Sequence, residues 1–350
     1  MRPVAVRILH PVPGATAGPL ESWVGAARAR LAERHRLGFT AAGAIDVRVV
    51  SWPLDDTPFG RRLRELVRAE RPDGLVVLGS GSIPLATRRD RRDLVDAARG
   101  SRRALANDRF SADAIAIADA TDALAALPDD LGDNALPRWL AEVRGWSVDD
   151  LRRRWRLGVD VDGPLDIVLT ADDDELASAE AQVVDTSHVR RLIEAVRAVT
   201  LDRNAELLIA GRTSSRTLAW FERNTASRTR ALVEERGMRT RKADQRPAAS
   251  VLGALLERDG PGSLGTHLAT LADGALIDSR VLLAHRCGAD EGAWPRAEDR
   301  FASDLLLPDA VADPWLRDLT RAAAEAPIPV LLGGHTLVGP GARLVARGPG

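Results

Sequence analysis

The stretch GLVVLGSGSIPL, residues 74–85, decides the fold class that we predict for the first half of the chain. The apolar run Leu75 to Leu78 passes into Gly79-Ser80-Gly81-Ser82, a pattern typical of a buried strand that opens into a loop. Residues 4–9 and 46–52 predict two further strands, and residues 21–42 and 59–70 predict the helices between them. Because parallel strands need long crossover connections, this alternation predicts a mostly parallel α/β sheet.

The same alternation continues with a predicted helix at 88–99 and predicted strands at 104–107 and 112–118. Helices should cover both faces of such a sheet, so we expect a three-layer domain over residues 1–172 that binds ligands beyond the carboxyl ends of its strands. Residues 173–350 predict a second α/β domain of unknown role. Its expected helices lie at 189–199, 217–236, 251–257 and 314–324, and its expected strands at 207–210, 276–285 and 330–332.

Composition excludes several classes of protein. The 350 residues carry 50 acidic and 49 basic side chains, so there is no net field to hold a polyanion and we do not expect nucleic-acid binding. No stretch reaches about 18 uninterrupted apolar residues, and we expect a cytoplasmic protein that does not enter membranes. Cys287 is the single cysteine, which excludes an intramolecular disulfide. The sequence leaves a homo-oligomer open.

Residues 156–166, RLGVDVDGPLD, place Asp160 and Asp162 two positions apart. On the end of one strand, side chains at this spacing point to the same side and could share a cation. Carboxylate oxygens are the protein ligands that Mg²⁺ prefers, so both aspartates are candidate Mg²⁺ ligands. The alternative is that these carboxylates cap the next helix.

Residues 1 to about 170 resemble the nucleotidyltransferase superfamily that includes the molybdenum-cofactor guanylyltransferases and the phospholactate guanylyltransferases. Residues 156–166 are similar to the late motif of that superfamily, a strand followed by Asp/Asn-x-Asp/Asn-Thr-Pro-x-Asp-Leu. Residues 75–85 are placed like the segment in which those enzymes carry an aspartate and then a proline. The resemblance implies a nucleotide-diphospho-sugar transferase-like fold, with an NTP and a small phosphorylated or hydroxylated acceptor as substrates and Mg²⁺ as the metal.

Two departures from that pattern weigh against turnover. The loop after the first strand, residues 10–18, contains Gly14 and Gly18 but no arginine or lysine, so only its backbone N–H groups are available to phosphates. The second departure is the Gly79–Ser82 loop, which offers hydroxyls where the resemblance calls for an aspartate. At another predicted strand end, Arg109 could bind a phosphate or carboxylate, and the alternative is a structural salt bridge. Arg109 and Asp113 are the candidate catalytic residues. The candidate nucleotide-binding residues of this half are Gly14, Gly18, Gly79, Ser80, Gly81, Ser82 and Asn107.

In the second half, Gly211-Arg212-Thr213-Ser214-Ser215 follows a predicted strand and precedes a predicted helix. Small residues, hydroxyls and an arginine at a helix start suit anion binding, which makes Arg212 and Ser214 further candidates. An ordinary capped turn is the alternative. Three hypotheses follow: a Mg²⁺-dependent nucleotidyltransferase, a binding module with the same pocket but no turnover and a regulatory or partner-binding second half, and an enzyme whose site is residues 212–215 with His335.

Overall fold

The computed structural model describes residues 2–53, 55, 57–170, 184–238 and 246–347. The chain forms two compact units. The first contains Met1–Thr16 and Gly25–Val161, and the second contains Ala17–Val24 and Asp162–Gly350. The boundary predicted at 172/173 lies outside the described residues. Within the described ranges, no helix combines the length and the apolar character needed to cross a membrane.

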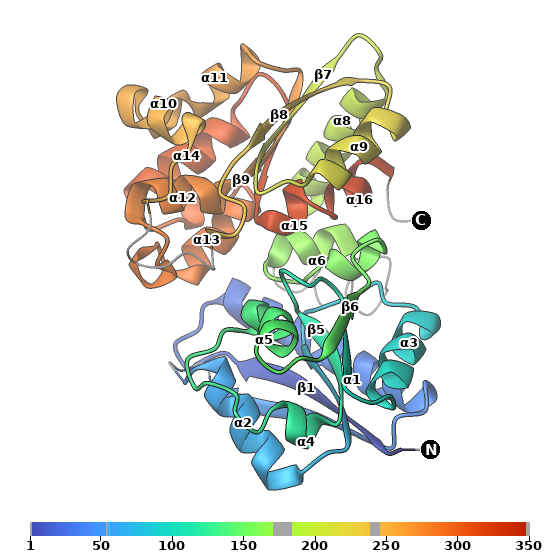
Figure 1. The fold of residues 1–350 in the computed structure, drawn as a ribbon. Helices are drawn as coiled ribbons and strands as arrows, with labels where there is room; N and C mark the ends of the chain where they lie inside the picture. The colour runs from blue at the N-terminus through green and yellow to red at the C-terminus, as the bar shows by residue number, and fades with distance from the viewer. Residues whose placement is uncertain (1, 54, 56, 171–183, 239–245, 348–350) are drawn as a thin grey trace. The chain divides into compact units, whose positions relative to one another are not determined.

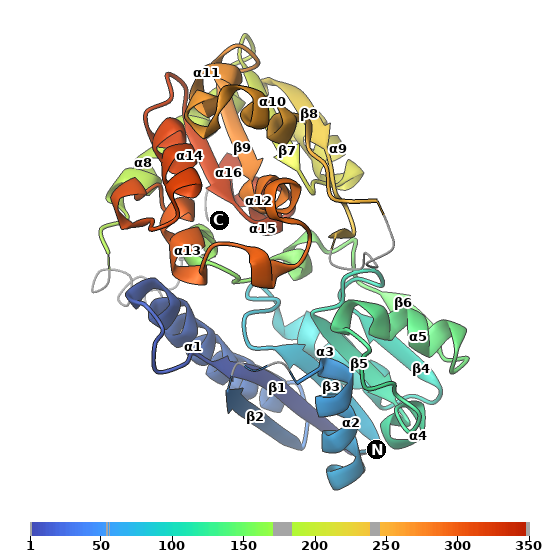
Figure 2. The same cartoon turned by 90° about the vertical axis from the view of Figure 1, so that its left-hand side faces the viewer.

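The first unit is built on a six-stranded mixed sheet with the order β2-β1-β3-β5-β4-β6. Figure 2 shows these strands side by side in that order. The strands are β1 Val4–Val12, β2 Asp46–Pro53, β3 Gly74–Gly79, β4 Arg103–Ala106, β5 Ala114–Ala118 and β6 Ser147–Asp150. The helices are α1 Pro19–Ala41, α2 Phe59–Glu70, α3 Arg88–Ala98, α4 Ala120–Ala123 and α5 Leu136–Glu142. The residues of α1 up to Val24 are counted with the second unit.

One strand departs from the parallel pattern. Strand β5 pairs antiparallel with both β3 and β4, whereas the pairs β1–β2, β1–β3 and β4–β6 are parallel. Only residues 107–113 join β4 to β5, and so short a connection cannot return the chain to the start of a parallel neighbour. The amino end of β5 therefore lies at the same edge as the carboxyl ends of the parallel strands.

Apolar side chains bury both faces of this sheet. One cluster joins Leu94 and Val95 of α3 and Phe39 of α1 to the sheet, and a second cluster joins Leu63 and Val67 of α2 to the opposite face. Figure 1 shows α1 and α3 on one side of the strands and α2, α4 and α5 on the other. Burial of both faces explains why the inner strands β3 and β5 are continuous apolar runs.

Asp90 fixes the start of α3 and connects it to the chain after β6. Its carboxylate forms a capping box with Thr87, whose hydroxyl accepts from the Asp90 backbone N–H. The same carboxylate accepts from Arg154 at 2.7 Å and from Arg156 at 2.8 Å. Burial alone would raise the pKa of Asp90, but the hydrogen bonds from Thr87 and the two arginines lower the pKa to about 2.

The second unit contains a four-stranded, wholly parallel sheet with the order β10-β9-β7-β8. Figure 1 shows α8, α9 and α16 on one side of it and α10, α11, α12 and α14 on the other. The strands are β7 Glu206–Gly211, β8 Arg228–Val233, β9 Gly274–Asp278 and β10 Val330–Gly333. The helices are α6 Pro164–Thr170, α8 Ser187–Leu201, α9 Ser215–Asn224, α10 Val251–Asp259, α11 Leu264–Ala269, α12 Ser279–Cys287, α13 Ala297–Asp304, α14 Pro314–Ala324, α15 His335–Val338 and α16 Ala342–Arg347.

Three predicted elements were wrong. The helix predicted over 217–236 ends at Asn224 and is followed by β8, an edge strand with little burial that therefore carries no apolar pattern. The strand predicted over 276–285 ends at Asp278 and becomes α12, because a continuous apolar run does not distinguish strand from helix. The strand predicted within 156–162 is a 3₁₀ turn, Trp155–Gly158, followed by a single bridge between Asp160 and Ser82.

The Asp90 network predicts that Asp90→Ala lowers the free energy of unfolding by about 2–4 kcal/mol, because it removes a helix cap and leaves two arginines without their buried partner. Asp93→Ala is the matched control. Asp93 also contacts Arg154, at 2.6 Å, but is partly exposed, so we expect a loss below about 1 kcal/mol. Urea unfolding of both variants checks this, and equal losses would contradict the role given to Asp90.

Candidate functional site

The loop after β3 forms the centre of the carboxyl edge of the first sheet. The backbone N–H of Ser80 donates to the Leu9 carbonyl at 2.8 Å, which holds the loop beside the end of β1. The Ser82 hydroxyl donates to the Gly79 carbonyl at 2.6 Å or the Asp113 carbonyl at 3.0 Å. Its contacts therefore shape the loop, and the loop contributes no carboxylate to a metal.

Gly81 lets this loop pack directly on residues 160–161. The Val161 N–H donates to the Gly81 carbonyl at 2.9 Å, and Ser82 forms a bridge with Asp160. A Cβ atom at Gly81 would lie 2.7 Å from the Val161 carbonyl oxygen, closer than real contacts of this kind. The predicted ligand Asp160 is thereby placed beside the predicted loop, and its Oδ1 accepts from the Val161 N–H at 2.9 Å.

Asn107 and Asp113 join the same edge through the short β4–β5 connection. The Asn107 side-chain oxygen accepts from the Asp113 N–H at 3.0 Å, and its amide nitrogen donates to an Asp113 carboxylate oxygen at 3.2 Å. The amide also donates to the Leu157 carbonyl at 3.0 Å, so Asn107 acts mainly as a buried brace. Arg109 lies half-buried in the same connection.

Two further groups at this edge, His10 and Arg28, were not among the predicted site residues. His10 Nδ1 lies 3.1 Å from the Ser80 hydroxyl, and both side chains are buried. Arg28 of α1 donates from Nε to the Val161 carbonyl at 2.7 Å. A Cβ atom at Gly81 would lie 3.1 Å from Arg28 Nε and 3.2 Å from Asp160 Oδ1, so the cation and the carboxylate flank the same glycine.

The electrostatics at His10 follow from this placement. Burial and the positive charge of Arg28 lower the pKa of His10, so its imidazole is neutral at physiological pH. A neutral imidazole can accept a hydrogen bond from the Ser80 hydroxyl or donate its own N–H to the Ser80 oxygen. In the sequence, His10 was visible at the end of a strand, whereas Arg28 lies well inside a helix and gave no signal.

The remaining predicted residues fall into different parts of the fold. Gly14 belongs to the first unit, and a Cβ atom there would meet nothing within 4 Å. Gly18 belongs to the second unit, where it lies against the Glu298 side chain. The Glu298 carboxylate accepts from the Leu20 N–H at 3.1 Å and the Glu21 N–H at 3.0 Å. These two amide groups at the start of α1 therefore bind a carboxylate of the chain itself.

A second group of charged residues lies at the carboxyl edge of the four-stranded sheet. Arg212, directly after β7, binds Asp278 at the end of β9 through two nitrogens, with Nε to Oδ2 at 2.6 Å and Nη2 to Oδ1 at 3.0 Å. His335 follows β10, and its Nδ1 lies 3.8 Å from Asp162 Oδ2. Ser214 caps α9, because its hydroxyl accepts from the Thr217 N–H at 3.2 Å. The predicted residues Arg212 and Ser214 thus have structural partners.

Asp166 is a buried acid of this unit whose pKa is strongly raised. Burial, together with the charges of Asp162 and Asp304, raises its pKa to about 8. Its Oδ2 accepts from the N–H groups of Asp162 at 3.0 Å and Gly163 at 2.9 Å, so Asp166 caps the start of α6. The alternative given for Asp160 and Asp162, helix capping, is performed by this third aspartate. Nearby, Arg280 and Asp304 form a buried ion pair.

The two predicted Mg²⁺ ligands belong to different units, Asp160 to the first and Asp162 to the second. Across the described residues, no group of three or more His, Cys, Asp or Glu side chains is arranged to hold a metal ion. The Mg²⁺ assignment stays a prediction.

Neither the models of known protein families nor the curated proteins contain a match to this chain.

At the edge of the second sheet, we expect substitution by alanine to destabilise the protein at one glycine and not at another. Gly211 has φ +124°, and a Cβ atom there would collide with the Asp278 side chain. Gly334 has φ −94° and nothing within 4 Å of such an atom. We expect Gly211→Ala to lower the free energy of unfolding by about 2 kcal/mol or more and Gly334→Ala to change it by less than about 0.5 kcal/mol. Similar values for both in chemical unfolding would contradict this packing.

The raised pKa of Asp166 predicts a pH-dependent stability. From about pH 4 to about pH 8 the folded protein keeps a proton on Asp166 that the unfolded chain has released. The free energy of unfolding should therefore fall as the pH rises, by up to about 1.4 kcal/mol per pH unit from this group. Asp166→Asn keeps the acceptor for the two N–H groups and removes the proton. The difference in unfolding free energy between wild type and variant should follow that slope, and a constant difference would contradict it.

Proposed function

We propose that the first unit binds the phosphates of a nucleotide at the carboxyl edge of its six-stranded sheet, and that it transfers the nucleotidyl group to a small phosphorylated or hydroxylated acceptor with release of pyrophosphate. The observation that supports this most is that Arg28 and Asp160 flank Gly81 beside the His10–Ser80 pair. A cation for phosphate, a carboxylate for a metal ion and a neutral imidazole are the groups that such a reaction uses.

Each residue has a role in this proposal. Arg28 would donate to phosphate oxygens, as guanidinium groups do in pairs of parallel hydrogen bonds. His10 would hold or accept a proton through the Ser80 hydroxyl. Asn107 would keep the neighbouring connection in place, with Arg109 and Asp113 facing the acceptor. A mixed sheet with helices on both faces is also compatible with the nucleotide-diphospho-sugar transferase-like fold that the resemblance implies.

The residues at this edge suit Mg²⁺ if substrate phosphates and water complete its coordination shell. Protein-bound Mg²⁺ commonly takes one or two carboxylates and completes its shell with substrate phosphates and water. Asp160 is the carboxylate that the first unit supplies beside the loop, so it would hold the ion in this unit. When bound, the ion would neutralise the charge that develops on the triphosphate.

A second candidate function is nucleotide or sugar-phosphate binding without turnover. The contacts of the Ser82 hydroxyl favour it, because the loop offers no acid where the resemblance calls for one and its serine already bonds to backbone carbonyls. In this case the second unit would carry a regulatory or partner surface.

Calorimetric titration with each NTP, with and without Mg²⁺, tests the proposal when it is combined with a pyrophosphate-release assay. We expect Arg28→Gln to weaken NTP binding by about tenfold or more, as loss of a charge-assisted contact does. Asp160→Asn should abolish the Mg²⁺ dependence while its side-chain oxygen still accepts from Val161. Arg36→Gln, which changes an exposed arginine of the same helix, is the control.

The outcomes separate the candidates. Binding with pyrophosphate release supports the transferase, and binding without release supports the second candidate. If NTPs do not bind, or if the Arg28→Gln variant binds them as tightly as the Arg36→Gln variant, the proposed nucleotide site is wrong.

A further inference from the structure

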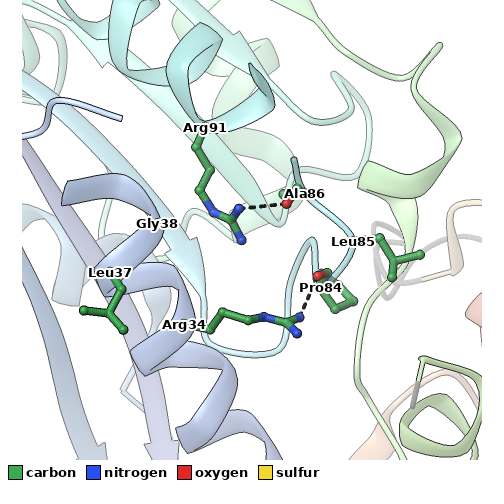
Figure 3. A pocket seen from close by; sticks show the side chains of 7 residues that line it. All are labelled: Arg34, Leu37, Gly38, Pro84, Leu85, Ala86 and Arg91. Atoms are coloured by element: carbon green, nitrogen blue, oxygen red, sulfur yellow. Dashed lines mark hydrogen bonds between the residues drawn. The ribbon is translucent and has the colours of Figure 1, made fainter. Parts of the chain in front are cut away.

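A hollow of about 530 Å³ opens on the first unit, and none of its lining residues belongs to the proposed nucleotide site. Helix α1 forms one wall, and residues 84–91 form the other (Figure 3). Its lining residues are Arg34, Leu37, Gly38, Pro84, Leu85, Ala86 and Arg91.

Alternate carbonyl groups of residues 82–86 accept hydrogen bonds from two arginines that line this hollow and from a buried histidine. The donors and acceptors are Arg34 to Pro84 at 2.7 Å, Arg91 to Ala86 at 2.7 Å and His35 to Ser82 at 2.8 Å. Figure 3 shows the guanidinium groups of Arg34 and Arg91 both directed at this segment. Positive charge is thus concentrated at one short stretch of backbone.

Arg91 is a buried cation whose hydrogen-bond partners are uncharged, and Asp90 acts on it only through its charge. Its side chain belongs to a residue that is 8% exposed, and it donates to the Ala86 carbonyl and approaches His35 Nδ1 at 3.5 Å. Among the described residues, no carboxylate forms an ion pair with Arg91, and its Nε has no hydrogen-bond partner. Burial and the charge of Arg34 lower the pKa of Arg91, although it stays protonated. Burying such a cation costs free energy that a bound anion would offset.

Gly38 makes this arrangement possible. A Cβ atom at Gly38 would lie 2.7 Å from Arg91 Nε, so only glycine lets the guanidinium group lie against α1. The arginine is therefore held at the wall of an open hollow rather than extended into solvent.

We propose that this hollow binds a small oxyanion of the phosphate or phosphate-ester class, at a site separate from the proposed nucleotide site. Two guanidinium groups that line one hollow can donate several charge-assisted hydrogen bonds to such an anion. The volume also leaves room for a small organic group next to the phosphate. Leu37 and Leu85 supply apolar walls for that group.

The anion would act on the nucleotide loop through His35. This side chain is fully buried, and burial together with the charge of Arg91 lowers its pKa to about 3. The neutral ring donates from Nε2 to the Ser82 carbonyl, so Nδ1 is the acceptor that faces Arg91. A shift of Arg91 toward a bound anion would change the hydrogen bonds that hold residues 82–86, where Ile83 has φ +47°. The site is thus placed to regulate the loop.

Isothermal titration of the full chain with inorganic phosphate, at ionic strength held constant with sodium chloride, tests the proposal. Leu37→Glu places a carboxylate at the wall of the hollow, and Leu37 is 56% exposed, so the fold should tolerate it. We expect Leu37→Glu and Arg34→Gln to weaken phosphate binding about tenfold, because one adds repulsion and the other removes a donor. Arg36→Gln, on the same helix but outside the lining, should bind within about twofold of wild type.

A further variant distinguishes phosphate binding in this hollow from binding at the proposed nucleotide site. Arg28→Gln should leave phosphate binding in the hollow unchanged, and circular dichroism confirms that each variant folds. The proposal is overturned if phosphate gives no saturable binding, if Leu37→Glu binds phosphate like wild type, or if Arg28→Gln alone removes the binding.

Discussion

The attachment of the Gly79–Ser82 loop to residues 160–161 is the constraint on which the geometry of the first unit depends. The Val161 N–H bonds to the Gly81 carbonyl, and the absence of a side chain at Gly81 allows the two backbones to approach. Asp90 supports this attachment, because it binds Arg154 and Arg156 a few residues before Asp160. A carboxylate, a cation and a histidine–serine pair therefore meet at one sheet edge, although they come from distant parts of the sequence.

The two units use charge in different ways. At the edge of the four-stranded sheet, Arg212 and Asp278 satisfy each other through two hydrogen bonds, and Asp166 holds the start of α6. Such buried pairs order a structure more readily than they bind a ligand. At the edge of the six-stranded sheet, Arg28 donates to the Val161 carbonyl and lies with Asp160 beside Gly81, next to the loop that follows β3. This grouping beside the loop is why the proposed function is assigned to the first unit.

Much of the fold was predictable because burial leaves a clear pattern. The strands near 4–9 and 74–78 and the helix at 59–70 were predicted and are present, since these strands are buried on both faces and the helix buries one regular stripe. The strand near 46–52 was also predicted and is present, as a partly buried edge strand. Strand β8 was missed because an edge strand needs no apolar alternation, and the change from strand to helix at Asp278 was missed because one apolar run covers both.

At the site, the loop, Asn107, Asp113 and Asp160 were predicted from strand ends and do lie at one edge. Arg28 could not be found this way, because a helical arginine reaches that edge only through tertiary packing.

Hydrogen–deuterium exchange of the full chain with a saturating nucleoside triphosphate and Mg²⁺ tests the central claim most directly. If the phosphates bind at the edge of the six-stranded sheet, amide exchange should slow in residues 79–83 and 159–161 and stay unchanged in residues 206–215 and 274–280. Protection confined to residues 211–215 and 333–336 would contradict the account and move the ligand site to the second unit.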